Sequence, residues 1–323
     1  MTPVNNIQRI LAQELSVFEN KFKDAVRSHV PLLDRIMHYI IKRKGKQVRP
    51  MFVFLSAKVF APANDMTYRA AALVELLHTA TLVHDDVVDE SNLRRGFFSI
   101  NALWKNKVAV LVGDYLLSKG LLLSLENNDF EILKILSKAV KQMSEGELLQ
   151  MEKSRSLNIT EDLYFEIITN KTASLLASSC AAGAWSTSAN PELCEKMRRF
   201  GELAGIAFQI KDDLFDYGNA TIGKPTGNDI KERKITLPLI YTLNQVSRTR
   251  KKEIIYIIKN ENRKKKFIKE IVDEVKSAGG IEYATDKMHK YRDQALGILN
   301  DLPDNEYRKG LADLVAYTTD RKY

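Results

Sequence analysis

The stretch "TYRAAALVELLHTATLVHDDVV", residues 67–88, decides the fold. Its apolar residues recur at helical spacing and cover nearly every side, so the pattern predicts a helix over 66–90 that is buried all round. A second unusual segment, 171–184, is rich in small residues, which let helices approach closely or leave room for a ligand. We expect these two segments to be central helices.

The rest of the chain is also helical in pattern. Strand-like alternation is nearly absent, and the 15 glycines and 8 prolines are scarce for 323 residues. Short breaks such as "FAPANDM" (60–66) and "STSANP" (186–191) separate the predicted helices, and no Ser- or Gly-rich linker divides the chain. The sequence therefore predicts an all-α fold in a single domain over 1–323. One irregular stretch, 216–236, is long enough to suggest a functional loop.

Composition narrows the class of protein. The chain is 45% hydrophobic and 28% charged, with 49 Lys and Arg against 41 Asp and Glu, a net charge of +8. This balance suits anionic ligands such as phosphates, nucleic acid or a membrane surface. Two cysteines, Cys180 and Cys194, give neither zinc-ligand spacing nor a disulfide framework, and we expect a cytoplasmic protein. The N-terminus does not resemble a signal peptide, and no apolar run reaches the ~18 residues expected of a transmembrane segment.

Two aspartate clusters stand at the ends of apolar segments. The pattern "DDVVD" at 85–89 recurs 127 residues later as "DDLFD" at 212–216. On a helix, the first and last aspartates of each cluster project from one face, and such grouped oxygen ligands suit Mg²⁺ that also binds substrate phosphates. One copy alone would equally fit a solvated acidic helix end, but two copies favour a metal site. The predicted metal-binding residues are Asp85, Asp86, Asp89, Asp212, Asp213 and Asp216.

Basic residues accompany both clusters. Arginine binds phosphate with a bidentate fork and lysine as a point charge. Each residue alone fits an ordinary surface charge, whereas the set predicts a ligand with an anionic, metal-bound head and an apolar tail. Nucleic acid fits poorly, because six carboxylates would repel its backbone. The basic candidates are Lys46, Arg49, Arg94, Arg95, Lys171 and Lys224.

Four further residues share these helix faces. His78 lies two turns before Asp85, although a buried histidine is more often a core residue than a ligand. Gln209, three residues before Asp212, faces the same way or makes an ordinary polar contact. Ala80 and Thr81 are small, so they either leave space beneath the metal site or allow close helix packing.

These motifs, in this order, resemble the trans-isoprenyl diphosphate synthases (polyprenyl synthetases). The resemblance spans the chain and rests on "GKQVRP" (45–50), "HTATLVHDDVVDESNLRRG" (78–96), "GD" (113–114), "NKTASL" (170–175) and "GIAFQIKDDLFDYGNATIGKPTGNDIKERKITLP" (205–238). It implies the isoprenoid synthase fold, a bundle of about 10–13 helices around a central cavity. Class I terpene cyclases, the nearest alternative, carry a different second metal motif.

The resemblance also implies residue roles. Three Mg²⁺ ions, or Mn²⁺ as a substitute, would be held by the aspartates and would bind an allylic diphosphate. The allylic diphosphate would also contact Arg94, Lys171, Gln209, Lys224 and Lys234, and isopentenyl diphosphate would contact Gly45, Lys46, Arg49, His78 and Arg95. The residues with catalytic roles would be Lys171, Thr172, Gln209 and Lys224.

Product length in this family is set by cavity depth. Ala80 and Thr81 would form part of the wall without closing it, which favours a hexa- to octaprenyl product for a quinone side chain over geranylgeranyl diphosphate. The resemblance further implies a homodimer that binds no nucleic acid. Two other hypotheses remain: a silent subunit of a heteromeric synthase, and a nucleic-acid or membrane-surface binder that uses the basic run "NRKKKFIKE" (262–270).

Overall fold

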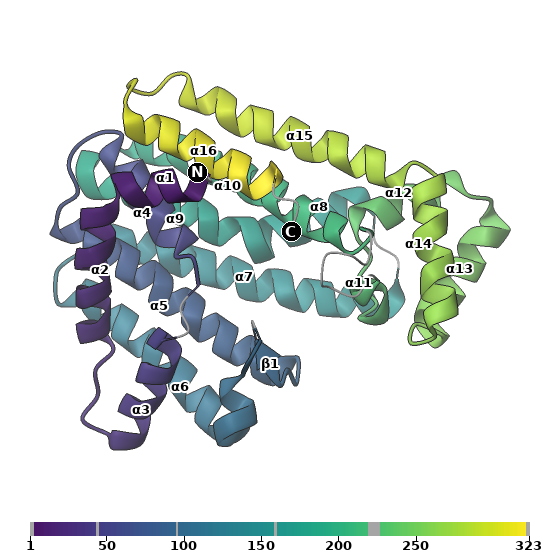
Figure 1. The fold of residues 1–323 in the computed structure, drawn as a ribbon, viewed down its shortest axis with the longest axis horizontal. Helices are drawn as coiled ribbons and strands as arrows, with labels where there is room; N and C mark the ends of the chain where they lie inside the picture. The colour runs from purple at the N-terminus through teal and green to yellow at the C-terminus, as the bar shows by residue number, and fades with distance from the viewer. Residues whose placement is uncertain (1–2, 43–44, 95, 158–159, 219–226, 321–323) are drawn as a thin grey trace. The chain divides into compact units, whose positions relative to one another are not determined.

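The computed structural model describes residues 3–42, 45–94, 96–157, 160–218 and 227–320. Figure 1 shows that helices make up almost all of these residues, which confirms the all-α prediction. Two compact units can be distinguished. Unit 1 contains Met1–Val140, Ser178–Arg198 and Leu302–Leu311, and unit 2 contains Lys141–Ala177, Arg199–Asp301 and Ala312–Tyr323. Four helices, α7, α9, α10 and α16, contribute residues to both units, and the single domain over 1–323 stays a prediction.

The elements wholly within unit 1 are six helices and one small hairpin. They are α1 (Pro3–Ile10), α2 (Ala12–Ala25), α3 (Pro31–Lys42), α4 (Val48–Lys58), α5 (Asp65–Val88), β1 (Leu93–Arg94), β2 (Phe97–Phe98) and α6 (Ile100–Leu125). The strands pair antiparallel, with Leu93 opposite Phe98. The shared helices are α7 (Phe130–Ser156), α9 (Ser174–Ser188), α10 (Pro191–Phe215) and α16 (Glu306–Asp320).

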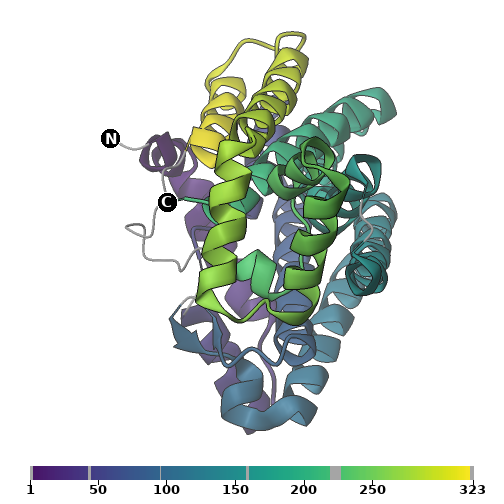
Figure 2. The same cartoon turned by 90° about the vertical axis from the view of Figure 1, so that its right-hand side faces the viewer.

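The elements wholly within unit 2 include the turn and the short helix that border the site described below. They are α8 (Glu161–Ile168), the π-helical turn η1 (Thr169–Ala173), α11 (Asn228–Lys231), α12 (Leu237–Gln245), α13 (Arg248–Asn260), α14 (Lys265–Ser277) and α15 (Gly280–Leu299). Figure 2 shows α13 and α14 side by side as an antiparallel pair.

Helix α5 is the buried helix that the sequence predicts. Its start is fixed by a capping box, in which the Asn64 side chain accepts from the Thr67 amide and the Thr67 hydroxyl accepts from the Asn64 amide. The helix packs along α6, and residues of both helices, such as Leu76, Val83 and Leu116, belong to one buried apolar cluster. This packing removes apolar surface from water on several sides of α5, and it fixes where Asp85 and Asp86 emerge.

The small residues of 171–184 serve close packing. A Cβ atom on Gly183 of α9 would lie 2.3 Å from the backbone oxygen of Val53 in α4, so only glycine fits there. The two helices, both in unit 1 at this point, touch through their backbones. Close approach therefore explains this glycine without any need for a ligand.

The core of unit 2 is rich in isoleucine. Buried residues from α8, α10, α12, α13 and α14 form one cluster that includes Ile210, Ile254 and Ile271. Ile230 of α11 belongs to the same cluster as residues of α10 and α12. The segment that carries α11 is thereby kept against the end of α10, where Asp212, Asp213 and Asp216 lie.

Two breaks divide the helical pattern of the chain. Leu11 separates α1 from α2, and the turn η1 lies between α8 and α9. By length and composition alone, one helix among the described residues, α6, is long and apolar enough to cross a membrane. Asp114 and Lys119 lie within α6, so its apolar residues do not form the uninterrupted run expected of a transmembrane segment. A core helix of a soluble protein would pass the same test.

Candidate active site

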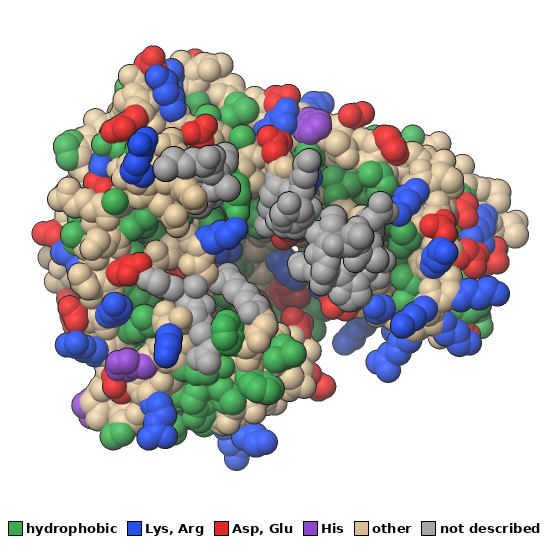
Figure 3. All heavy atoms as spheres, in the orientation of Figure 1, with side chains coloured by type: hydrophobic (Ala, Val, Ile, Leu, Met, Phe, Trp, Pro, Cys, Tyr) green, Lys and Arg blue, Asp and Glu red, His purple; other side chains and the backbone are tan. Residues whose placement is uncertain are grey.

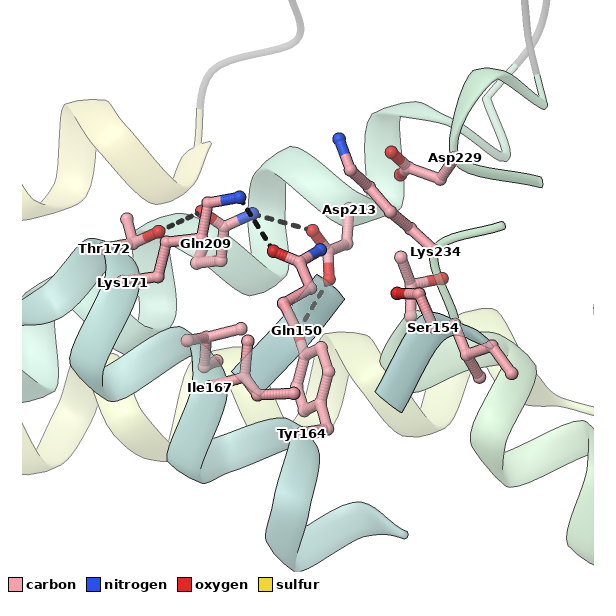
Figure 4. Close-up of a pocket in the computed structure, with 13 residues that line it drawn as sticks. Gln150, Ser154, Tyr164, Ile167, Lys171, Thr172, Gln209, Asp213, Asp229 and Lys234 are labelled. Atoms are coloured by element: carbon pink, nitrogen blue, oxygen red, sulfur yellow. Dashed lines mark hydrogen bonds between the residues drawn. The ribbon is translucent and has the colours of Figure 1, made fainter. Parts of the chain in front are cut away.

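A cavity of about 110 Å³ lies within unit 2, large enough for roughly three or four water molecules at ~30 Å³ each. It is bordered by α7, α8, η1, α10 and the segment before α12 (Figure 4). Polar and apolar side chains share its walls, as in sites that bind an anionic head beside a hydrocarbon. Its lining residues are Gln150, Ser154, Tyr164, Ile167, Ile168, Lys171, Thr172, Gln209, Asp213, Asp229, Lys234, Ile235 and Thr236.

A chain of hydrogen bonds crosses one wall of the cavity. The Thr172 hydroxyl donates to Oε1 of Gln209 over 2.8 Å, and Nε2 of Gln209 donates to Oδ1 of Asp213 over 2.8 Å. The Tyr164 hydroxyl donates to the other carboxylate oxygen of Asp213 over 2.7 Å. The chain fixes the orientation of the Gln209 amide, because its oxygen must accept and its nitrogen must donate.

Lys171 stands at the same wall. Its ammonium donates to Oε1 of Gln150 over 2.7 Å and pairs with Oε2 of Glu147 at 2.5 Å. Lys171 and Thr172 both lie in η1, a geometry that is frequent at functional positions. Gly146 lets α7 approach this turn, since a Cβ there would lie 2.8 Å from the Lys171 amide nitrogen. The sequence "NKT" thus becomes a pair of adjacent polar groups at the cavity.

Carboxylates are crowded around Asp213. Burial and the neighbouring Asp212 raise the pKa of Asp213 to about 7, although the hydrogen bonds from Tyr164 and Gln209 oppose this rise. Burial, followed by the charges of Asp213 and Asp216, raises the pKa of Asp229 to about 8. The charge of Lys234 lowers both values. Burial and mutual repulsion thus make these carboxyls costly to ionise, a condition that a bound cation relieves.

The carboxylate of Asp216 accepts hydrogen bonds from the backbone. Its two carboxylate oxygens accept from the amides of Asn228 (2.8 Å) and Asp229 (3.1 Å), which begin the short helix α11. Gly227, just before them, has a φ of +78°, and its Cβ would collide with Ile268. Asp216 therefore fixes the start of α11 against the end of α10, a role that the sequence pattern did not suggest.

The aspartates of this region have the hard oxygen atoms that Mg²⁺ prefers, and their mutual repulsion favours an ion. Within the described residues, however, no group of three or more His, Cys, Asp or Glu side chains lies in a metal-binding arrangement. Asp213 and Asp216 already accept hydrogen bonds, and Asp212, half-exposed in α10, does not line the cavity. The donor set fits a divalent ion that shares its shell with substrate and water better than one enclosed by protein alone.

The first aspartate cluster belongs to unit 1. Asp86 is buried, Asp85 is half-buried and Asp89 is exposed at the end of α5. The Asn101 side chain donates to the backbone oxygen of Asp86 and ties the end of α5 to α6.

The predicted isopentenyl diphosphate residues also lie in unit 1. Lys46 is exposed before α4, Gly45 is half-buried, Arg49 is half-buried at the start of α4, and His78 is buried in α5. Arg94 ends strand β1. Arg95 and Lys224 lie outside the described residues.

The two proposed wall residues have different environments. Ala80 is fully buried in the apolar cluster between α5 and α6, beside residues such as Leu76 and Val83. Thr81 is half-buried, and its hydroxyl donates to the backbone oxygen of His78 over 2.9 Å. Thr81 therefore has more room for a larger side chain than Ala80 has.

Eight of the thirteen residues that line the cavity had no role predicted from the sequence, and two of them are polar groups that bear on Asp213. Tyr164 lies seven residues, two helical turns, before Lys171, and this spacing was the available signal. Asp229 lies inside the quoted "GKPTGND" stretch but received no role. Of the predicted residues, the structure gathers Lys171, Thr172, Gln209, Asp213 and Lys234 around one cavity.

Similarity to known proteins extends over nearly the whole chain. Residues 30–275 match the polyprenyl synthetase family. An all-trans-nonaprenyl-diphosphate synthase (geranyl-diphosphate specific) of Rhodobacter capsulatus is 34% identical over 96% of each chain. The octaprenyl diphosphate synthase of Escherichia coli K12 is 31% identical over 98% of this chain and 99% of its own. A polyprenyl synthase of Caulobacter crescentus CB15, crystallised with calcium and isoprenyl diphosphate, has a TM-score of 0.90 at 33% identity and covers 99% and 98% of the two chains.

Proposed function

Because the chain belongs to the polyprenyl synthetase family, we propose that it condenses isopentenyl diphosphate with an allylic diphosphate into a long all-trans polyprenyl diphosphate. The observation that carries this proposal is the cavity that joins Lys171 and Lys234 to the chain Thr172–Gln209–Asp213–Tyr164. Cationic and hydrogen-bonding groups beside buried isoleucines suit a diphosphate head attached to an apolar chain. The relatives that make nonaprenyl and octaprenyl diphosphates support a long product.

We propose that Asp85, Asp89 and Asp212 hold Mg²⁺, with Asp86, Asp213 and Asp216 orienting the ligands. When bound, the ions would neutralise the diphosphate of the allylic substrate and favour its departure. The calcium bound by the Caulobacter synthase supports a divalent ion in this family. Tyr164 and Gln209 would fix the position of the Asp213 carboxylate, so that less reorganisation is needed when substrate binds.

The chain's own cations would hold the two substrates. Lys171, Lys234 and Arg94, with Lys224, would bind the allylic diphosphate. Isopentenyl diphosphate would be bound separately by Gly45, Lys46, Arg49, His78 and Arg95. Holding both molecules in place removes much of the entropic cost of bringing them together.

Bond formation needs no nucleophilic side chain. The allylic carbon–oxygen bond breaks, the electron pair leaves with the diphosphate, and an allylic cation remains. The double bond of isopentenyl diphosphate then donates its electrons to form the new carbon–carbon bond, and a proton is lost to the released diphosphate.

Thr172 and Gln209 are well suited to face this cation. Thr172 directs its proton to Gln209, so the lone pairs of its oxygen remain available toward positive charge. Apolar neighbours such as Ile167 keep water from the cation.

Product analysis tests the proposal. Purified protein is incubated with Mg²⁺, farnesyl diphosphate and labelled isopentenyl diphosphate, and the products are separated by chain length. We expect hexa- to octaprenyl diphosphate, with geranylgeranyl diphosphate as the alternative. A product that stops at geranylgeranyl diphosphate would exclude long-chain synthesis. Consumption of the allylic substrate without isopentenyl diphosphate would indicate a terpene cyclase, and no turnover without a second protein would indicate a silent subunit.

We further propose a homodimer, formed through α6. Five large apolar residues within one face of this helix are exposed, more than a monomer usually leaves in one patch. They are Val110, Leu111, Leu121, Leu122 and Leu125. Light scattering after gel filtration should give twice the chain mass of 36.8 kDa, and Leu111→Asp should yield monomer.

A cytoplasmic location is proposed as well. It is supported by two cysteines, Cys180 and Cys194, that are both free thiols in the structure.

A further inference from the structure

The helical pair α13–α14 accounts for most of the net positive charge of the protein. Residues 248–277 contain eleven Lys and Arg but five Asp and Glu, a net charge of +6 out of +8 for the whole chain. Both helices turn isoleucines and valines, such as Ile254 and Ile271, toward the core of unit 2. Charge is thus concentrated on the outward side of one pair of helices, which Figure 3 shows as a gathering of Lys and Arg side chains.

Three of the five acidic residues of the pair gather around one arginine. Arg250 pairs with Glu253, Glu270 and Glu274 at 2.8 Å each, and these interactions raise the pKa of its guanidinium. Two of these glutamates belong to α14, so Arg250 of α13 links the two helices and offsets one of the three negative charges. Outside this group, residues 248–277 contain ten Lys and Arg against two carboxylates, Glu261 and Asp273.

We define the basic face as Arg248, Lys252, Lys259, Lys265, Lys266, Lys269 and Lys276. All seven side chains are exposed, and within the part of the chain that the structure describes none of them forms an ion pair. Asp273 is the exposed carboxylate of α14 that lies among them. A row of uncompensated cations attracts a dense anionic surface.

An exposed aromatic ring lies in the middle of this row. Along α13, Arg248, Lys252, Tyr256 and Lys259 follow one another at spacings of four, four and three, so they form one outward stripe. The Tyr256 residue is 60% exposed, and within the described residues its ring makes no aromatic contact. Lysines around a tyrosine are typical of helices that lie on a membrane, where the ring enters the headgroup layer and the cations meet anionic lipids.

We propose that the basic face docks the enzyme on an anionic lipid surface. The proposal rests on the proposed function for its purpose: a hexa- to octaprenyl chain is insoluble in water, and each buried methylene favours its transfer into a bilayer. An enzyme held at the membrane releases such a product where it partitions. Nucleic acid would meet the same charges, but it offers neither a hydrocarbon phase for the product nor a headgroup layer for Tyr256.

Vesicle co-sedimentation without substrates tests the proposal. One set of vesicles is made of phosphatidylcholine alone. The other is an equal mixture of phosphatidylcholine and phosphatidylglycerol, which is anionic. We expect binding to the anionic vesicles that falls with added salt. The variant Lys265→Gln/Lys266→Gln/Lys269→Gln should bind about tenfold to 100-fold more weakly, as three lost surface cations imply. Tyr256→Ala should weaken binding without changing the charge.

The matched control removes three charges elsewhere. Lys23 in α2, Lys138 in α7 and Lys290 in α15 are exposed, and their triple change to Gln gives the same net charge as the test variant. We expect this control to bind vesicles as the wild type does. Both triple variants should retain turnover with farnesyl diphosphate, because none of these residues lies at the cavity.

Several results would overturn the proposal. The first is that the wild type does not bind anionic vesicles. The second is that both triple variants lose vesicle binding to the same degree. The third is that the wild type binds neutral and anionic vesicles equally, which would indicate insertion of apolar residues instead. If the variant Lys265→Gln/Lys266→Gln/Lys269→Gln loses binding to single-stranded RNA but still binds vesicles, the basic face binds nucleic acid rather than lipid. Because sedimentation is measured without substrates, its failure is separate from failure of the proposed synthase activity.

Discussion

The hydroxyl of Tyr164 donates a 2.7 Å hydrogen bond to Oδ2 of Asp213, although the two residues are 49 positions apart. Tyr164 is buried in α8, and Asp213 is buried near the end of α10. A buried carboxylate with a fixed donor on each oxygen has one orientation available to it. Tyr164 is therefore a positioning residue for the second aspartate cluster.

Tyr164→Phe should lower kcat by about tenfold or more, because a buried hydrogen bond to a charged group contributes about 1.5–3 kcal/mol. Only Gln209 would then orient Asp213, so the concentration of Mg²⁺ needed for half-maximal rate should rise. Steady-state kinetics over a range of Mg²⁺ concentrations measures both effects.

The matched control is Tyr283→Phe. The Tyr283 hydroxyl also donates to a carboxylate of unit 2, that of Glu161, but neither residue lines the cavity. We expect its Mg²⁺ dependence to be unchanged. If both variants lose activity equally with no change in Mg²⁺ dependence, Tyr164 has only a general structural role.

Lys171→Gln should reduce kcat/KM for the allylic substrate by about 100-fold. The change removes the cation that would bind the diphosphate and leaves Glu147 facing the cavity wall, so that both attraction and charge balance are lost. Lys287→Gln is the control, because Lys287 pairs with Glu161 away from the cavity. An allylic KM that stays unchanged in Lys171→Gln would contradict a role in diphosphate binding.

Thr81→Phe should shorten the product, since the ring would project from the half-buried face of α5 into the path of the growing chain. Ala80→Phe should do the same but also lower the free energy of unfolding by about 1–3 kcal/mol, because Ala80 lies in a packed cluster. Chromatography of the products and thermal unfolding measure the two effects. Thr81→Ser should leave chain length unchanged, and an unaltered product from Thr81→Phe would remove this residue from the wall.

The buried carboxyl of Asp229 should make the ligand-free enzyme less stable as pH rises. Its pKa is raised by burial from 3.8 to about 8, so the folded protein keeps a proton that the unfolded chain has already released. The free energy of unfolding should therefore fall between about pH 4 and pH 8.

Asp229→Asn removes this cost. At pH 8 it should raise the free energy of unfolding by at least about 1 kcal/mol, the equivalent of one pKa unit, whereas at pH 5 it should change little. Asp286→Asn, at an exposed position of α15, is the control. A stabilisation that is the same at both pH values would show that ionisation of Asp229 is not its cause.

Much of the architecture follows from local sequence. The all-round apolar pattern of 67–88 predicts the buried α5, and the aspartate repeats predict acidic helix ends, because helical periodicity is a property of neighbouring residues. Basic charge predicts Lys171, helical spacing predicts Gln209 and the family motifs add the role of Thr172, and the structure places all three at one cavity. Helix ends were less predictable: Leu11 and η1 depend on packing rather than on turn residues.

The sequence by itself determined the helical class, the two aspartate clusters and the family. Only the tertiary structure decided that Tyr164 and Gln209 share the carboxylate of Asp213, that Asp216 caps α11, and that Arg250 pairs with two glutamates of α14. These partners come from separate helices or from the two ends of a loop. Periodicity indicates which face of a helix a side chain occupies, but which other side chain meets it depends on how the helices pack.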